Sequence, residues 1–405
     1  MDMVGYLILV WLAANGVLVG VFRRDLARYW REPVFRFPLL ILESDDWGAG
    51  PLSQAKPLRD IADVLARYRD STGRAPVVNL ALVLAIPDGG RIRREGEYHR
   101  QTIEAPMFVE IRNALRDGVE KGVFSLQLHG LEHFWPETLM SSESPQVREW
   151  LRQDGPAVTE DLPSHLQSRW IDATSLPSVP LSRDVIRVAV AEEVQTYKRV
   201  LGAVPLVVVP PTFAWTREVE AAWAEQGLAC VVTPGWRYTR RNVQSGLEGD
   251  EGPFANGDHA GKLIYLVRTE YFEPTRGRDA AHALSALDSA SAAGRPCLLE
   301  NHRDNFINDP QACMHSLAEL DKLYRQALVR HDDVRFVSSA ELAHILRTRD
   351  PAWIENRFSG RLPAYLARMR NNSRFWKIST LTGLAGLLSM LVGLLCVGKR
   401  MKCSA

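Results

Sequence analysis

The chain has 405 residues, of which 46% are hydrophobic and 24% are charged. This composition is ordinary for globular domains and excludes disordered and fibrous chains. The 49 lysine and arginine residues nearly balance the 48 aspartate and glutamate residues, so no overall positive field would hold a nucleic acid. The five cysteines show no CxxC spacing, and neither a disulfide scaffold nor a thiolate zinc site is expected.

The chain begins with an uncharged, apolar segment from Met3 to Phe22, which is long enough to cross a hydrocarbon core of ~30 Å. A cleaved signal peptide would carry basic residues before the apolar segment, whereas here Arg23 and Arg24 follow it. We therefore expect a retained transmembrane anchor over residues 1–22 and a basic juxtamembrane segment over residues 23–37.

Residues 378–398 are again uncharged and apolar, and Trp376 lies just before them, where an interfacial aromatic residue is typical of a membrane span. A second transmembrane helix is expected there. It is preceded by a linker and basic juxtamembrane segment over residues 348–377 and followed by a basic tail over residues 399–405. The chain is thus predicted to cross the cell membrane twice and to contact membrane lipids.

Basic residues near the two predicted spans are unevenly distributed, and such residues tend to stay on the cytoplasmic side. Three lie on the outer side, namely Lys399, Arg400 and Lys402. Eight lie on the loop side, namely Arg23, Arg24, Arg28, Arg31, Arg368, Arg370, Arg374 and Lys377. The count predicts a cytoplasmic domain held close to the lipid headgroups, with a periplasmic or extracellular position as the alternative.

Short apolar segments alternate with helix-like stretches over residues 38–347, the pattern of parallel strands joined by helical crossovers. It predicts one α/β domain built on a barrel or a large open sheet. Eight strands are expected, at 38–43, 77–86, 124–128, 206–209, 229–233, 263–268, 296–300 and 334–337. Helices are expected at 58–69, 108–121, 185–201, 217–226, 279–292, 310–330 and 339–347.

The stretch from residue 141 to residue 182 is rich in proline and serine and shows no regular period. It is predicted to be an irregular insertion over one face of the domain. A lid and a substrate-binding loop are the two roles that this position favours.

Chemically reactive side chains cluster just after three of the expected strands, which is the edge of a parallel sheet that carries functional sites. Asp45 and Asp46 follow the first strand, His129 and His133 follow the third, and His302 follows the seventh. Two histidines four residues apart can converge on one metal ion at ~2.0–2.1 Å from each nitrogen. One of two adjacent carboxylates can join them while its neighbour accepts a proton.

The order of these motifs resembles that of the polysaccharide deacetylase family, the carbohydrate esterases with a NodB-type domain. The matching residues are Asp45-Asp46, then His129-x-x-x-His133, then Pro210-Pro211, then Leu299 through His302. On this resemblance the chain is identified as a divergent, membrane-anchored member. The resemblance implies a distorted (β/α) barrel of seven strands, so at least one of the eight expected strands would be peripheral.

The resemblance also implies the roles of single residues. Asp46, His129 and His133 would hold a divalent metal, with zinc expected, because two imidazoles and one carboxylate leave an open position on the ion. Asp45 would be the general base and His302 the general acid. The backbone N–H of Thr212 would help to hold the oxyanion. The implied reaction removes an N-acyl group, such as acetyl, from an amino sugar of a surface polysaccharide or of its lipid-linked precursor.

The chain departs from the family pattern at several positions, among them Glu43-Ser44 before the acidic pair, where the family usually has Thr-Phe. An arginine usually precedes the Pro-Pro pair and steadies the base, but Val209 stands there. Arg303, next to His302, is the candidate to supply that charge from another loop. Trp47 and Trp215 are candidates to stack on sugar rings near the site.

Two other classes of protein remain open. Residues 129–133 also spell H-x-x-E-H, the pattern of a zinc peptidase whose base is the glutamate, here Glu132. That mechanism requires a continuous helix, and Gly130 and Pro136 disfavour one. The other class is a non-catalytic glycan-binding or assembly protein with a decayed deacetylase site.

Overall fold

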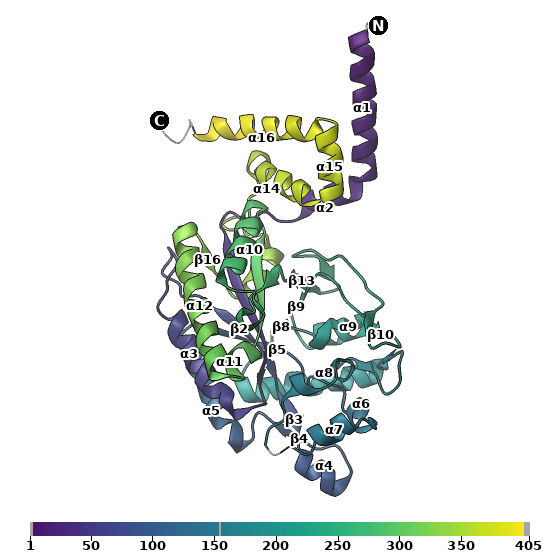
Figure 1. Ribbon diagram of the computed structural model, residues 1–405, viewed down its shortest axis with the longest axis vertical. Helices are drawn as coiled ribbons and strands as arrows, with labels where there is room; N and C mark the ends of the chain where they lie inside the picture. The colour runs from purple at the N-terminus through teal and green to yellow at the C-terminus, as the bar shows by residue number, and fades with distance from the viewer. Residues whose placement is uncertain (1–2, 154, 401–405) are drawn as a thin grey trace.

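The computed structural model describes residues 3–153 and 155–400. An α/β domain forms the body of the molecule, and a group of helices from both ends of the chain stands at one end of it (Figure 1). The helical group includes α2 (Arg23–Arg31) and α14 (Phe358–Asn371), which contact each other, and α14 joins it to the domain by contacting α10 (Ala280–Ala292).

The centre of the domain is a sheet of seven parallel strands that follow one another side by side. Each strand is an apolar segment bounded by loops, as expected for strands that helices cover. In spatial order the strands are β13 (Leu263–Val267), β9 (Cys230–Thr233), β8 (Val207–Val208), β5 (Phe124–Leu128), β2 (Val78–Val83), β1 (Leu39–Gly48) and β15 (Pro296–His302).

The sheet curls until its two ends meet in one stretch of chain. β13 pairs with β9, and β14 (Glu270–Tyr271), which follows β13 almost directly, pairs with β15 at the opposite end. The backbone N–H of Thr269, between β13 and β14, donates to the carbonyl of Leu298 at 2.7 Å. The parallel sheet is therefore curled and not open, in keeping with the barrel that the resemblance implied.

All eight expected strands lie in this sheet, and one is peripheral as expected. β16 (Arg335–Phe336) pairs only with the start of β1, off the main path. β12 (His259–Ala260) adds a short antiparallel edge to β13. Three small antiparallel pairs lie in the loops, namely β3 (Ala85–Pro87) with β4 (Arg100–Thr102), β6 (Ile171–Asp172) with β7 (Val179–Pro180), and β10 (Arg240–Arg241) with β11 (Leu247–Glu248).

The seven expected helices are present within a few residues of the predicted bounds. Several begin at a residue whose side chain caps the first turn, as Ser338 does together with Glu341 in a capping box. The seven are α3 (Ala55–Leu65), α5 (Val109–Glu120), α8 (Arg183–Leu201), α9 (Arg217–Glu225), α10 (Ala280–Ala292), α12 (Pro310–Arg330) and α13 (Ser339–Thr348). Four short helices lie in the loops, namely α4 (Gly89–Glu95), α6 (Pro136–Met140), α7 (Pro145–Trp150) and α11 (Asp304–Ile307).

Side chains on the two faces of the strands pack into two different cores. Leu40 and Leu42 of β1 join the larger core beneath the surrounding helices, whereas Leu39 and Ile41 point to the other face and join the smaller core. The next residue of this second series on β1 is Glu43. This face therefore changes from apolar to polar toward the carboxyl end of the strand, which is where the candidate site lies.

The described part of residues 141–182 consists mostly of turns and loops, with a few short elements among them. It contains α7, the β6–β7 pair and two single 3₁₀ turns. Its side chains build a small core of their own with the preceding loop, formed by Phe134, Leu139, Val147, Trp150, Ala157, Leu162 and Leu166. The segment is thus a small layer packed on the domain.

The two terminal segments differ from each other. α1 (Met3–Val21) is long and apolar enough to cross a membrane, a property that membrane anchors share with signal sequences. The predicted transmembrane helix at 378–398 is not confirmed, because α15 (Ser373–Leu381) and α16 (Leu384–Arg400) meet at an angle of 96°, as in a broken span or a re-entrant loop. Gly383 permits this turn with a φ of 76°. Residues 401–405 of the predicted basic tail lie outside the described residues.

Candidate active site

The sequence-predicted polar residues meet at the carboxyl ends of β1, β5 and β15. Asp45 and Asp46 lie near the end of β1, His129 follows β5 directly, and His302 ends β15. Parallel strands bring these ends to one edge of the sheet. With His133 in the loop after His129, five residues from three distant parts of the chain share one site.

A β-bulge separates the two neighbouring carboxylates of β1. The pairing of β1 with β2 shifts register between Ser44 and Trp47, and Asp46 has a φ of 72°, which is strained for a residue with a Cβ. In a regular strand, adjacent side chains would point to opposite faces. Here the bulge turns Asp46 toward the histidines, while Asp45 keeps its place in the pairing with β15.

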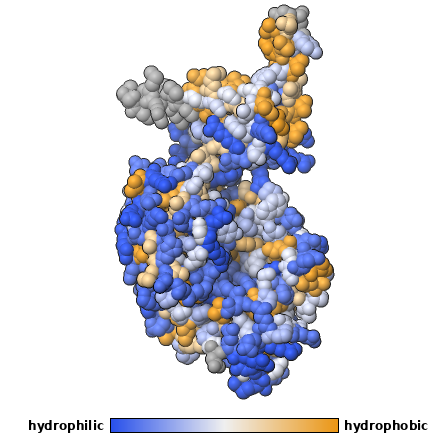
Figure 2. Space-filling view, in the orientation of Figure 1, coloured by the Kyte–Doolittle hydropathy of each residue, from blue (hydrophilic) through white to orange (hydrophobic). Residues whose placement is uncertain are grey.

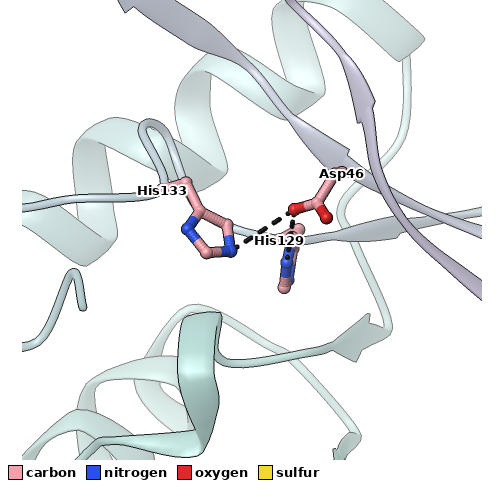
Figure 3. Close-up of side chains that lie close together, drawn as sticks. All are labelled: Asp46, His129 and His133. Carbon is pink, nitrogen blue, oxygen red and sulfur yellow. Dashed lines mark ion pairs between the residues drawn. The ribbon is translucent and has the colours of Figure 1, made fainter. Parts of the chain in front are cut away.

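Asp46, His129 and His133 converge on one point (Figure 3). The Nε2 atoms of His129 and His133 each lie 3.3 Å from Oδ1 of Asp46. All three side chains are buried, and their potential ligand atoms lie within 4.8 Å of one another. The structure therefore brings together the three residues that the sequence predicted as metal ligands.

The donor atoms of this trio suit a divalent metal. His129 Nδ1 lies 2.6 Å from the carbonyl of Val209, which only accepts, so Nδ1 carries a proton and Nε2 is the nitrogen that would bind a metal. Burial lowers the pKa of His129, but its hydrogen bond to Asp46 and the charges of Asp45 and Asp46 outweigh burial and raise the pKa. Burial lowers the pKa of His133 to about 4, which keeps its ring neutral at neutral pH. Burial alone would raise the pKa of Asp46, but the hydrogen bond from His129 and the nearby histidine charges outweigh it, so the carboxyl group is ionised. One carboxylate and two imidazoles form a zinc ligand set, in which a bound metal would replace any proton on Nε2.

Asp45 is held by Arg268, which follows β13. Arg268 Nη2 donates to Asp45 Oδ1 at 2.7 Å, and both side chains are almost completely buried. Burial opposes ionisation of Asp45, but the charge of Arg268 outweighs it together with smaller contributions, so the pKa of Asp45 lies below its ordinary value. A buried carboxylate is thereby kept ready to accept a proton.

Arg268 also joins a deeper pair of carboxylates beneath the site. Its Nη1 lies 3.2 Å from Glu300, and its Nη2 lies 3.8 Å from Glu43. Burial raises the pKa of Glu43 to about 7 despite the nearby Arg268 charge. One guanidinium group thus faces three buried acidic side chains, and its attraction to them keeps it positively charged.

Asp45, Glu300 and His302 form a second group close enough to hold a metal. Arg268 already contacts the two carboxylates of this group, and a metal cation there would face a fixed guanidinium charge. Among the described residues, no arginine or lysine forms an ion pair with the trio of Asp46, His129 and His133, which is therefore the better metal centre.

His302 is oriented by Glu273, a residue that the motif analysis did not identify. Nδ1 of His302 donates to Oε1 of Glu273 at 2.6 Å, and Asn305 donates to the other carboxylate oxygen of Glu273. Burial lowers the pKa of His302, but the Glu273 hydrogen bond and the charges of Asp46 and Asp45 outweigh it and raise the pKa to about 10. His302 is therefore a protonated imidazolium at neutral pH.

A pocket of about 270 Å³ opens over these side chains. Asp45, Asp46, His129, His133 and His302 line one part of it, and the remaining wall comes from loops, namely Glu160, Gln167, Pro210, Thr212, Phe213, Arg276 and Asp304. Glu160 and Gln167 belong to the layer at residues 141–182. The segment at residues 141–182, which was expected to lie over one face of the domain, thus forms part of the pocket wall.

The Pro-Pro loop presents Thr212 to this pocket. Thr212 and Phe213 have φ values of 53° and 56°, in the left-handed region that side chains rarely adopt. The Thr212 side chain shares a hydrogen bond of 2.7 Å with Ser168 of the covering layer. The predicted oxyanion residue therefore lies at the wall of the pocket.

Arg303 does not steady the base, which corrects the sequence prediction. Its side chain is fully buried and pairs through two nitrogens with Glu160, at 2.8 and 2.7 Å. This pair ties the covering layer to the turn after β15. The charge beside Asp45 comes instead from Arg268, whose sequence signal is a lone arginine at the end of an apolar strand.

Trp47 and Trp215 are also reassigned. Both side chains have an exposed fraction of 0% and belong to the larger core. Trp47 donates its indole N–H to Ser44, and Trp215 donates to Glu220. Because neither ring offers a face to solvent, neither can stack on a sugar.

Glu132 is not placed as a catalytic base. Residues 129–135 form a loop rather than a helix. The Glu132 carboxylate is fully buried and accepts from Tyr98 at 2.9 Å and from Arg169 at 2.7 Å, and it forms an ion pair with Arg100 at 2.6 Å. The helix that the peptidase hypothesis requires is absent from this described segment.

Comparisons with known proteins place the chain in no family. No protein-family model and no curated protein matches it. Among solved structures it is similar to the peptidoglycan deacetylase PdaC from Bacillus subtilis, with 11% identity and a TM-score of 0.37 over 78% of this chain and 94% of that chain. It is also similar to a family 4 carbohydrate esterase from Streptomyces lividans, with 10% identity and a TM-score of 0.34 over 75% of this chain and 94% of that chain.

A third similarity is to a 4-alpha-glucanotransferase from Thermococcus litoralis, with 11% identity and a TM-score of 0.40 over 76% of this chain. The chain spans 40% of the length of that enzyme. The geometry of the site therefore carries the functional argument by itself.

Proposed function

We propose that this protein is a metal-dependent hydrolase that removes an N-acyl group, such as acetyl, from an amino sugar of a polysaccharide. The observation that carries the proposal is the joint presence of three parts around one pocket. These are a metal-ligand trio, a carboxylate kept ionised by a buried arginine, and a histidine kept protonated by a buried glutamate.

Asp46, His129 and His133 are the residues that would hold the metal. A divalent ion at such a centre supplies Lewis-acid polarisation of the acyl carbonyl and lowers the pKa of water. The two imidazoles present Nε2 toward Asp46, and the Val209 carbonyl fixes the His129 ring in the required tautomer.

Asp45 is the proposed general base. It accepts a proton from the water that attacks the acyl carbon, and Arg268 holds its carboxylate in one orientation while keeping it ionised. Asp45 forms no part of the ligand trio, although it is the neighbour of Asp46 in the chain. Its lone pairs are therefore available for the proton.

His302 is the proposed general acid. When the bond between the acyl carbon and the sugar nitrogen breaks, His302 donates a proton to the departing nitrogen, which would otherwise be a poor leaving group. Glu273 binds Nδ1, so Nε2 is the nitrogen that can deliver the proton. The products are a carboxylic acid and a free amino sugar. We place the backbone N–H of Thr212 at the developing oxyanion, which fits its position on the pocket wall.

This proposal is preferred over a decayed site because the site retains both reactive groups and a partner for each. A non-catalytic glycan-binding protein does not require the strained backbone at Asp46. It also does not require the buried pairs Asp45–Arg268 and His302–Glu273. The peptidase alternative requires a helix at residues 129–133, but this segment is a loop. Its proposed base, Glu132, is already paired with two arginines.

The test is release of acid and amine from defined substrates. Detergent-solubilised protein is incubated with N-acetylated and N-formylated amino-sugar oligomers, and acetate, formate and free amine are measured together. We expect equimolar acid and amine, loss of release after chelation, and recovery when Zn²⁺ is returned. Absence of release from the whole substrate panel by zinc-loaded protein would contradict the proposal.

A further inference from the structure

The helical end of the molecule exposes a large apolar surface. Figure 2 shows hydrophobic residues along α1 and α16, whereas most of the domain surface is hydrophilic. The exposed residues include Leu7, Ile8, Leu9 and Val10 of α1 and Met390, Leu391, Leu394 and Leu395 of α16. Soluble proteins rarely leave a surface of this kind uncovered.

The turn between α15 and α16 is suited to a lipid environment. The helical hydrogen-bond pattern breaks there, and Trp11 of α1 donates its indole N–H to the free carbonyl of Thr382 at 2.7 Å. The Thr382 hydroxyl donates in turn to the side chain of Asn15 at 2.9 Å. In hydrocarbon, irregular backbone is tolerated only where protein groups satisfy it, as they do here.

The depth of this turn follows from α1. Nineteen residues at 1.5 Å each give α1 a length of about 28 Å, which matches the hydrocarbon core. The turn at Thr382 meets α1 between Trp11 and Asn15, roughly 9–15 Å from the domain end of α1 at Val21. Figure 1 shows α1 upright and α16 running across it. With α1 spanning the bilayer, α16 therefore lies flat in the leaflet nearest the domain.

The membrane-facing helices attach to the amino ends of the strands. Arg368 of α14 donates to the carbonyls of Ala293 and Pro33, just before β15 and β1, at 2.8 and 2.7 Å. Arg295, immediately before β15, pairs with Glu32 at the end of α2. The base of the curled sheet thus rests on α2 and α14.

The pocket lies at the other end of the same strands. Asp46 lies seven residues after Leu39 in β1, a rise of roughly 23 Å. The layer of α2 and α14 adds about 10 Å. The metal-ligand trio is therefore roughly 30 Å from the membrane surface, at the end of the domain opposite α2 and α14.

We propose that α1, α15 and α16 form a membrane-embedded base that directs the pocket away from the bilayer, so that the substrate is an extended glycan chain rather than a headgroup-level, lipid-linked sugar. The substrate part of this inference rests on the proposed deacetylase function. It reverses the expectation that two anchors hold the site near the headgroups, because the anchors join the base of the sheet and the site lies at its opposite end.

Site-directed spin labelling tests the orientation in the full-length protein in phosphatidylethanolamine and phosphatidylglycerol vesicles. Labels are placed at L391C on the exposed side of α16 and at E143C on the covering layer. Cys313, Cys396 and Cys403 are replaced by serine, whereas Cys230 and Cys297 are fully buried and stay. We expect the label at position 391 to be relaxed by lipid-soluble oxygen and the label at position 143 by a water-soluble nickel complex. A water-exposed label at 391, or a lipid-exposed label at 143, would overturn the orientation.

Substrate competition tests the rest of the inference in the same vesicles. A soluble N-acetylated amino-sugar oligomer and a lipid-linked N-acetylated sugar are supplied at equal concentrations, and acetate is measured. We expect release from the oligomer to be on the order of 10²-fold faster, because a sugar that cannot reach the attack geometry loses about that much. Equal or faster release from the lipid-linked sugar would overturn the inference while leaving the deacetylase function standing. Release from neither would contradict the deacetylase function itself, and the spin labels would still decide the orientation.

Discussion

Asp45 lies directly opposite His302 in the parallel pairing of β1 and β15. Glu43 lies opposite Glu300 two residues earlier in the same register. Alternate residues of a strand share a face, so the proposed base and acid stand at the same height on one face of the curled sheet, above the buried carboxylates that surround Arg268. The backbone pairing alone thus sets the separation of the two groups that move protons.

Arg268 is predicted to control the acid limb of the pH profile. Replacement by glutamine removes the positive charge that lowers the pKa of Asp45, so this pKa should rise and the acid limb should move to higher pH. Turnover should fall by ~10²-fold while zinc content is unchanged. The pH dependence of kcat/KM and metal analysis measure the two effects.

Arg268→Gln also leaves three buried acidic groups without their cation, at a cost of ~3–5 kcal/mol in unfolding free energy. Arg268→Lys keeps the charge and is the matched control, with partial rescue of both turnover and the acid limb. If the glutamine variant folds and shows the wild-type acid limb, then Arg268 does not act on Asp45.

Glu273 is predicted to set the alkaline limb. His302 must carry a proton to act as the acid, and its raised pKa of about 10 keeps it protonated below that pH. Glu273→Gln removes the negative partner at Nδ1, so the pKa should fall and the alkaline limb should move to lower pH. Histidine titration by NMR on metal-free protein reports the same shift independently. An unchanged alkaline limb together with a lowered His302 pKa would mean that another group is the acid.

Trp47 is predicted to serve stability and not substrate binding. Trp47→Ala should lower the free energy of unfolding by ~3–5 kcal/mol, because it empties a fully buried site in the core. The KM of the remaining folded protein should be unchanged. Trp135→Ala, at a partly exposed tryptophan of the neighbouring loop, is the comparison and should cost less. A stable Trp47→Ala variant with a raised KM would instead show that the Trp47 ring contacts the substrate.

Glu132→Gln distinguishes the deacetylase from the peptidase. The substitution weakens the pairing of the buried Arg169, which still contacts Glu193, so we expect a loss of about 3 kcal/mol in unfolding free energy. Turnover per folded, zinc-loaded molecule should persist, because Glu132 lies outside the pocket lining. A folded, metal-loaded variant without turnover would favour a glutamate-base mechanism.

The fold and the metal trio were accessible from the sequence because local patterns specify them. The strands are continuous apolar segments, and the helices begin at capping residues such as Ser338. Two histidines four residues apart and an adjacent acidic pair are visible as residues in the chain. Their distance from one another then depends only on parallel strand order, which the alternating pattern also predicts.

The partners of the reactive groups were not accessible in the same way. Arg268, just after β13, contacts Asp45 from more than 200 residues away in the sequence. Glu273, just after β14, contacts His302. Only the closure of the sheet brings these residues together. Trp47 was misassigned because the bulge after Ser44 changes which face each side chain takes. The bend in the second predicted span was not visible in the sequence, because Gly383 turns an apolar segment that composition describes as continuous.

The most direct test of the central claim measures zinc content and turnover together in one set of variants. Asp46→Ala, His129→Ala and His133→Ala are compared with His315→Ala, which replaces an exposed histidine on α12. We predict that wild type and His315→Ala retain one zinc per chain and release acid and amine, whereas each ligand variant loses the metal and the reaction together. Full zinc occupancy in the three ligand variants, or undiminished turnover without metal, would contradict the assignment of this site.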